Sequence, residues 1–291
     1  MTEGFCLGGC LIALGLVLQA VLGPVVWQAF AWPVNGVVLT VFLAVVGAVF
    51  LLRRQVSFCQ FLGSYQAAIP TLLYAVALTI VMGLTRQTGE DGWLSSMLTF
   101  WPFVLIYVLM ALILGVVILR RLTHLSNWRR DVPFILNHAG LFIAMTTATL
   151  GNADMQRMKM VTTAGQAEWR ALTSDGSIRE MPLAITLRRF IMETYDDGSP
   201  KRFASEIEVK TQEGSTFEAT VDVNKPVVAD GWKIYQYGYD TSMGAESTTS
   251  VLELVSDPWL PVVYAGIYMM LAGAVCMFVL GGIKRKGGES V

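Results

Sequence analysis

No charged residue occurs between Gly4 and Leu52, and this run is more than twice the roughly 20 residues that one helix needs to cross a membrane. A break is therefore needed. The stretch GPVVWQAFAWPVNG at 23–36 supplies the glycine, proline and tryptophan that are typical of a turn at a membrane interface. Hydrophobic residues make up 54% of the chain and charged residues 15%, against about 25% charged in soluble domains. The sequence therefore predicts an integral membrane protein that begins with two helices.

Apolar runs bounded by charges predict a multi-pass α-helical membrane protein with about six transmembrane helices. They are expected at about 5–26, 33–52, 67–84, 93–119, 132–153 and 258–283. The fifth run is bounded by Asp131 and Asp154. The net charge of −1 indicates no nucleic-acid partner. The apolar runs make membrane lipid the expected surrounding.

Basic residues predict the orientation of these helices. Nine of them lie on one side of the membrane if the N-terminus is on that side: Arg53, Arg54, Arg120, Arg121, Arg129, Arg130, Lys284, Arg285 and Lys286. The positive-inside rule then places both termini in the cytoplasm. The first apolar run has neither a basic segment before it nor the small residues of a cleavage site, so we interpret it as a retained helix.

The segment 152–257 has a different composition. It holds 11 Lys and Arg against 17 Asp and Glu, a net charge of −6. Its short stretches, such as LAITLRRF, FASEIEVKT and TFEATVDV, alternate apolar and polar residues between turn signals such as SDG, DDGSP, QEG and ADG. This pattern predicts an antiparallel β domain, a sandwich or a folded-over sheet, on the outer side of the membrane.

An aromatic run in this domain, GWKIYQYGYD, places Tyr235, Tyr237 and Tyr239 on one face of a strand. Such a face suits a partner protein or a β core, and we favour the core.

The four cysteines predict no disulfide framework. Cys6 and Cys10 lie at the start of the first helix, Cys59 lies in the first cytoplasmic loop, and Cys276 lies in the last helix. None falls in the outer domain and none forms a CxxC motif, so a thiol-redox role is not expected. Burial in packed helices is the expected role of Cys6, Cys10 and Cys276.

His138, in the stretch FILNHAGLFIAM, is the titratable side chain that stands out within the predicted helices. It lies eight residues after Arg130, or about 12 Å of helix rise, which places it inside the cytoplasmic leaflet. The small residue Gly140 would let a flat ligand or another helix approach nearby. Two interpretations remain open. The imidazole could hydrogen-bond a facing helix, or it could be an axial ligand to haem iron.

Met145 lies seven residues after His138 and so on the same helix face. It could be a second soft ligand, although a methionine in this position is more often part of the packed core.

Several stretches resemble the ResB-type proteins of system II cytochrome c biogenesis. They are RRDVPFILNHAGLFIAMTTATLGNADMQRMKM, EWRALTSDGSIREMPLAITLRRFIMETY, VNKPVVADGWKIYQYGYD and LVSDPWLPVVYAGIYMMLAGAVCMFV. The resemblance runs from about Arg129 to Ile283 and is weaker over the first four helices. The ordered set of stretches carries it, since no single motif is diagnostic.

The resemblance implies a function in cytochrome c maturation. Such proteins act with a CcsA-type haem-handling membrane protein to move haem b across the membrane for attachment to apocytochrome c, with a thioredoxin-like protein as a reductant of the thiols. The family's intramembrane histidine matches His138, which is therefore expected to ligate haem iron, with Met145 as a weaker candidate. The chain would be a non-catalytic or co-catalytic subunit of a cytochrome c haem lyase in the cytoplasmic (inner) membrane. The alternative is a membrane-anchored scaffold or sensor that binds no haem.

The expected organisation has four parts. Residues 1–131 form four transmembrane helices with cytoplasmic loops, and residues 132–153 form the fifth helix with His138. Residues 154–257 form the β-rich extracytoplasmic domain, inserted between helices five and six. Residues 258–291 form the sixth helix and a short basic cytoplasmic tail.

Overall fold

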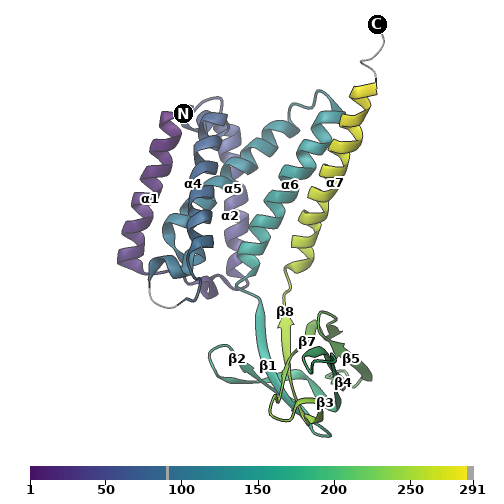
Figure 1. Ribbon diagram of the computed structural model, residues 1–291. Coiled ribbons are helices and arrows are strands. Elements are labelled where there is room, and N and C mark those ends of the chain that lie inside the picture. Colours follow the sequence, from purple (N-terminus) through teal and green to yellow (C-terminus); the bar gives the residue numbers. More distant parts are fainter. Residues whose placement is uncertain (90–91, 287–291) are drawn as a thin grey trace. The chain divides into compact units, whose positions relative to one another are not determined.

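The computed structural model describes residues 1–89 and 92–286, and it divides into two compact units (Figure 1). The helical unit contains residues 1–153 together with the chain from Trp259 onward, and the β unit contains residues 154–258. The part of the expected basic tail that follows Lys286 lies outside the described residues.

Seven α-helices are found in the described residues of the helical unit. They are α1 (Thr2–Leu22), α2 (Val34–Leu52), α3 (Ser57–Leu62), α4 (Tyr65–Leu84), α5 (Trp101–Leu122), α6 (Trp128–Gly151) and α7 (Leu260–Lys286), with 3-10 turns η1 (Trp27–Phe30) and η2 (Trp93–Thr99). Within the described residues, all except α3 are long and apolar enough to cross a membrane. The prediction of a multi-pass helical membrane protein is therefore confirmed, while the short helix α3 was not expected.

Helix α6 begins at Trp128 rather than near Val132. Asn127 is its N-cap, and the Asn127 side chain accepts a hydrogen bond of 3.1 Å from the backbone N–H of Arg129. Asp131 consequently lies inside the first turn instead of before the helix. The expected boundary at residue 131 falls within α6, because a paired carboxylate can be buried where an isolated one would be excluded.

Helix α5 is central in the helical unit and packs against α1, α2, α4 and α6. Helix α7 packs along α6 (Figure 1). The backbones of these two helices come close together at Gly140 and Gly266. A Cβ atom at Gly140 would lie 2.5 Å from the carbonyl oxygen of Gly266, closer than any side chain allows. Small residues at this crossing therefore determine how closely α7 can pack.

The β unit is one antiparallel sheet whose strands follow α6 and precede α7 in the chain. The strands are β1 (Gln156–Thr163), β2 (Ala167–Thr173), β3 (Ile178–Thr194), β4 (Pro200–Thr211), β5 (Thr216–Asp222), β6 (Val227–Ala229), β7 (Trp232–Tyr239) and β8 (Thr249–Ser256), with a 3-10 turn η3 (Gly244–Glu246). Their order across the sheet is β5-β4-β3-β2-β1-β8-β7-β6. The first and last strands of the unit, β1 and β8, pair along their whole length.

The hairpins form where the turn signals predict them. Gly176 and Gly214 have φ values of 82° and 85°, which glycine adopts without steric cost, and each turn is closed by backbone hydrogen bonds. The prediction of an antiparallel β domain is confirmed. Strand β5, at one edge, contacts β6 and β7 at the other, so the unit is a single folded-over sheet rather than a two-sheet sandwich.

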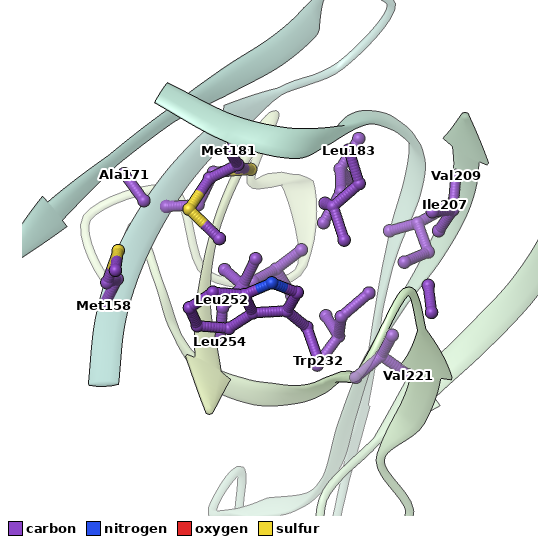
Figure 2. Packing of buried hydrophobic residues seen from close by; sticks show 14 of the residues in the cluster. Met158, Ala171, Met181, Leu183, Ile207, Val209, Val221, Trp232, Leu252 and Leu254 are labelled. Carbon is purple, nitrogen blue, oxygen red and sulfur yellow. The ribbon is translucent and has the colours of Figure 1, made fainter. Parts of the chain in front are cut away.

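Alternating side chains of the folded sheet enclose an apolar core. Leu183, Ile185 and Leu187 on β3 are at most 2% exposed, whereas the residues between them are less buried. Figure 2 shows the Trp232 indole among aliphatic and methionine side chains contributed by several strands. The unit thus has its own core, as expected for a domain that is separate from the helices.

The three tyrosines of β7 do not share one face, and the prediction that they form core is wrong for Tyr237. Tyr237 is 54% exposed, and Tyr235 is half-buried. The register of β7 against β8 shifts between Gln236 and Gly238, and Tyr239 stacks on an aromatic side chain of β3 with 4.8 Å between ring centroids. A β-bulge changes which face the following residues occupy, and simple alternation does not predict it.

Candidate functional site

His138 lies in the middle of α6 and is half-buried. Its Nδ1 lies 2.8 Å from the carbonyl oxygen of Phe134, one turn earlier, and its ring stacks on the Phe134 ring with 3.8 Å between centroids. A carbonyl oxygen can only accept a hydrogen bond, so this contact places the proton of the neutral imidazole on Nδ1. The lone pair is then on Nε2.

Nε2 of His138 has no hydrogen-bond partner among the described residues. The imidazole is thus oriented by its own helix and not by a facing helix, which differs from the packing interpretation offered by the sequence. An imidazole held through Nδ1–H by a backbone carbonyl, with Nε2 free, is the usual state of a histidine that binds a metal. The arrangement can supply one nitrogen ligand.

An ion pair between a partly buried arginine and a buried aspartate lies beside the stacked ring of Phe134. The guanidinium of Arg121, at the end of α5, lies 5.3 Å from the Phe134 ring centroid and pairs with Asp131. The other carboxylate oxygen of Asp131 accepts hydrogen bonds of 2.7 Å from the backbone N–H groups of Ser126 and Asn127. Arg121, Phe134 and His138 therefore form a continuous stack that joins α5 to α6.

These supporting residues were missed from the sequence. Asp131, Phe134 and His138 are spaced three and four residues apart, so they lie on one helix face. That spacing, with an acidic residue at the start of an apolar helix, was the available signal. The partner Arg121 comes from another helix, and no local pattern identifies it.

Gly140 serves a helix contact. The backbone of α7 at Gly266 and the side chain of Met270 occupy the space that a Cβ atom at Gly140 would need. Of the two approaches that the sequence left open, a flat ligand or another helix, the structure has the helix at Gly140.

Met145 is half-buried and lies about 10.5 Å along α6 from His138. It lines a cavity of about 250 Å³ between α4, α5 and α6, together with Ile106, Tyr107 and Met110. The Tyr107 hydroxyl donates a hydrogen bond of 2.9 Å to the carbonyl oxygen of Met145. His138 is not among the residues that line this cavity, so the structure does not bring the two candidate ligands together, and a role for Met145 stays a prediction.

The cysteines are placed differently from the expectation. Cys59 is buried and Cys276 is half-buried, but Cys6 and Cys10 are exposed. The burial predicted for Cys6 and Cys10 is wrong, because α1 packs through the other face, which carries glycines. Among the described residues, no group of three or more His, Cys, Asp or Glu side chains could hold a metal ion.

The helical unit and the β unit make this chain an integral membrane protein with a separate antiparallel β domain. Residues 127–251, which include α6 and most of the β unit, match the ResB-like family. The resemblance to ResB-type proteins is thereby confirmed over this region, which contains His138.

One similar protein is the cytochrome c biogenesis protein CcsB of Prochlorococcus marinus, which is 29% identical over 119 residues. The match covers 40% of this chain and 27% of that protein, so the chain spans about a quarter of the relative's length. Among solved structures, the cytochrome c haem lyase CcmF is similar over 71% of this chain and 34% of its own, with 14% identity and a TM-score of 0.36.

Proposed function

We propose that this chain is a membrane subunit of the system II cytochrome c maturation machinery. It helps to carry haem b across the membrane and presents it, with a CcsA-type partner, for attachment to apocytochrome c. The observation that carries the proposal is His138, whose Nδ1 is held by Phe134 and whose Nε2 has no partner among the described residues. The ResB-like match over residues 127–251 supports it, because His138 lies within the matched region.

The residues around His138 would suit haem, which His138 would hold through its free Nε2. Haem supplies iron, which neutral imidazole binds through a nitrogen lone pair. Phe134 orients the imidazole through its carbonyl oxygen and its ring, and Arg121 holds that ring in place. Met145 lies two turns away, so a second ligand from the CcsA-type partner is the simpler assignment.

The proposed topology places both termini in the cytoplasm and the β domain outside the cytoplasmic (inner) membrane, between the fifth and sixth spans. Within the helical unit, the N-terminus and the last described turn of α7 lie at one end, together with the ends of α2 and α5 that carry arginines (Figure 1). An excess of arginine is typical of the cytoplasmic side. The β domain contains no cysteine, so reduction of the apocytochrome thiols is assigned to a thioredoxin-like partner.

This proposal makes the chain a non-catalytic or co-catalytic subunit of the haem lyase. The alternative function is a scaffold or sensor that binds no haem. Binding of haem by the purified complex separates the two, because a scaffold needs no iron ligand.

The test replaces His138 with alanine in the full chain, expressed with its membrane partners. We expect at least a tenfold loss of haem absorbance per protein in the purified complex and a matching loss of mature cytochrome c. Free imidazole should restore part of both, because it can fill the vacated ligand position. Leu141→Ala is the matched control, since Leu141 is 40% exposed on the same helix and provides no ligand.

A normal haem spectrum and normal cytochrome c in the His138→Ala complex, with the protein present in the membrane, would overturn the ligand assignment. Met145→Leu should retain haem if the partner provides the second ligand. Loss of haem in that variant would assign the ligand to Met145 instead.

A further inference from the structure

A cavity of about 240 Å³ lies at the arginine-bearing end of the helical unit, apart from His138. Arg53 and Arg54 follow the end of α2, Cys59 and Gln60 belong to α3, and Arg120 and His124 lie at and just beyond the end of α5; all six line it. Sequence segments far apart in the chain therefore bring three guanidinium groups around one space.

The described residues that line this cavity include no carboxylate. Among the described residues, none of Arg53, Arg54 and Arg120 forms an ion pair, whereas the neighbouring Arg121 is paired with Asp131. Guanidinium groups that share a cavity repel one another unless an anion lies between them. The cavity is therefore electrostatically suited to an anion that the described residues do not provide.

Two of the three guanidinium groups are held in position by backbone carbonyls. Arg120 donates a hydrogen bond of 2.9 Å from Nη1 to the carbonyl oxygen of Gly63. Arg53 donates from Nη1 to the carbonyl oxygen of Phe50, and its guanidinium lies 3.7 Å from the centroid of the Phe50 ring. Each guanidinium has five N–H donors, so donors remain for a ligand in an orientation that is already fixed.

The position of the cavity indicates the source of the anion. Helices α2 and α5 are long and apolar enough to cross a membrane, and the cavity lies where they end, which is the level of lipid headgroups. Leu51 and Phe58, which are close in sequence to its arginines, are 72% and 53% exposed and could contact acyl chains. A soluble phosphate ion has no acyl chains, so it would gain nothing from these exposed apolar side chains.

We propose that the cavity lined by Arg53, Arg54 and Arg120 binds the phosphate headgroup of an anionic phospholipid. Charge-based orientation explains why arginines occur on this side of the membrane. It does not explain why three of them line one cavity and two of these are fixed by carbonyls. Basic pockets between transmembrane helices are a known way of binding anionic headgroups.

The experiment measures retention of phosphatidylglycerol and of phosphatidylcholine with matched acyl chains, by mass spectrometry of the purified full chain from mixed vesicles. We expect the parent protein to prefer phosphatidylglycerol. Arg53→Gln with Arg120→Gln should weaken this preference by about fivefold for each arginine removed. Arg129→Gln with Arg130→Gln is the matched control, because it removes two arginines from the same side that do not line the cavity.

A second variant tests the cavity with a smaller risk of misfolding. Arg54→Gln removes a side chain that makes no hydrogen bond or ion pair within the described residues, and it should weaken the preference about fivefold. Equal losses in the cavity variants and in the control, or no loss in either, would overturn the proposal. Displacement of the lipid by millimolar inorganic phosphate would also overturn it, because the cavity would then be a site for the free ion.

Discussion

Asp131 is only 1% exposed, although it lies in the first turn of a helix that is apolar enough to cross a membrane. Its charge is offset by Arg121, and its second oxygen accepts from two backbone N–H groups before the helix. A buried carboxylate that is satisfied in this way fixes the chain around it. Asp131 therefore determines both where α6 begins and where the Phe134 ring lies beneath His138.

Replacing Asp131 with alanine should destabilise the protein by about 2 kcal/mol, because the partly buried Arg121 would lose its partner and two backbone N–H groups would lose their acceptor. Thermal unfolding of the detergent-solubilised protein measures this. Arg130→Ala, at an exposed position in the same turn, should change the melting temperature little. Equal melting temperatures for the parent and Asp131→Ala would show that the ion pair contributes no stability.

The sequence singles out His138 as a candidate, because a histidine inside an apolar run is unusual, and its role as a ligand stays a prediction. It could not identify the tautomer or the supporting residues. Those depend on the rotamer that brings Nδ1 to the Phe134 carbonyl and on Arg121, which reaches α6 from another helix. Exposure of Cys6 and Cys10 was missed for the same reason, since the packed face of α1 is determined by its neighbours.

At the scale of elements, the close approach of α6 and α7 makes a clear prediction. Gly140→Val would place a branched side chain against the backbone of Gly266, and we expect a loss of about 2 kcal/mol or more. Gly47→Val in α2 is the matched control, because nothing lies within 4 Å of a Cβ atom there. Comparable thermal stability of the two variants would contradict the proposed role of the glycine contact.

Strand β2 carries a carboxylate that makes the β unit sensitive to acid. Glu168 accepts hydrogen bonds from the Arg170 side chain at 2.8 and 2.9 Å and from the backbone N–H of Arg170 at 2.9 Å, where the register of β2 shifts. The hydrogen bond from the Arg170 guanidinium lowers the pKa of Glu168 from 4.5 to about 2. The lowered pKa means that the ionised form stabilises the folded state.

This contribution should be complete above pH 4.5 and should be lost as the pH falls through about 2. Glu168→Gln should therefore destabilise the β unit by about 1 kcal/mol at pH 7 and by much less at pH 2. The value at pH 7 is small because solvent screens the ion pair. Thermal unfolding followed by β-sheet circular dichroism at both pH values measures the difference. A loss of stability that is the same at both pH values would assign the effect to packing rather than to charge.

Alternation and turn residues predicted most strands because each hairpin is specified locally. They did not predict the bulge between Gln236 and Gly238, which places Tyr237 and Tyr239 in different surroundings. A bulge depends on the neighbouring strand, so one strand's pattern cannot indicate it.

At the scale of the whole molecule, the positions of the four cysteines lead to a prediction. None of the four lies in the β unit, and the proposed function assigns thiol reduction to another protein. Replacing all four with alanine or serine should leave cytochrome c maturation largely intact, apart from the packing lost at buried Cys59. Complete loss of maturation after replacement of Cys6 and Cys10 alone, with normal amounts of protein in the membrane, would contradict the assignment.

The proposed topology is tested by fusion to a reporter that is active only outside the cytoplasm. The described residues contain six candidate spans, which is an even number of crossings, so residue 1 and Lys286 share one side, and the arginines at the ends of α2 and α5 favour the cytoplasm. Fusions after Asn152 and Thr241 should be active, and fusions after Arg54 and Lys286 should be inactive. Activity at Lys286 would require an odd number of crossings.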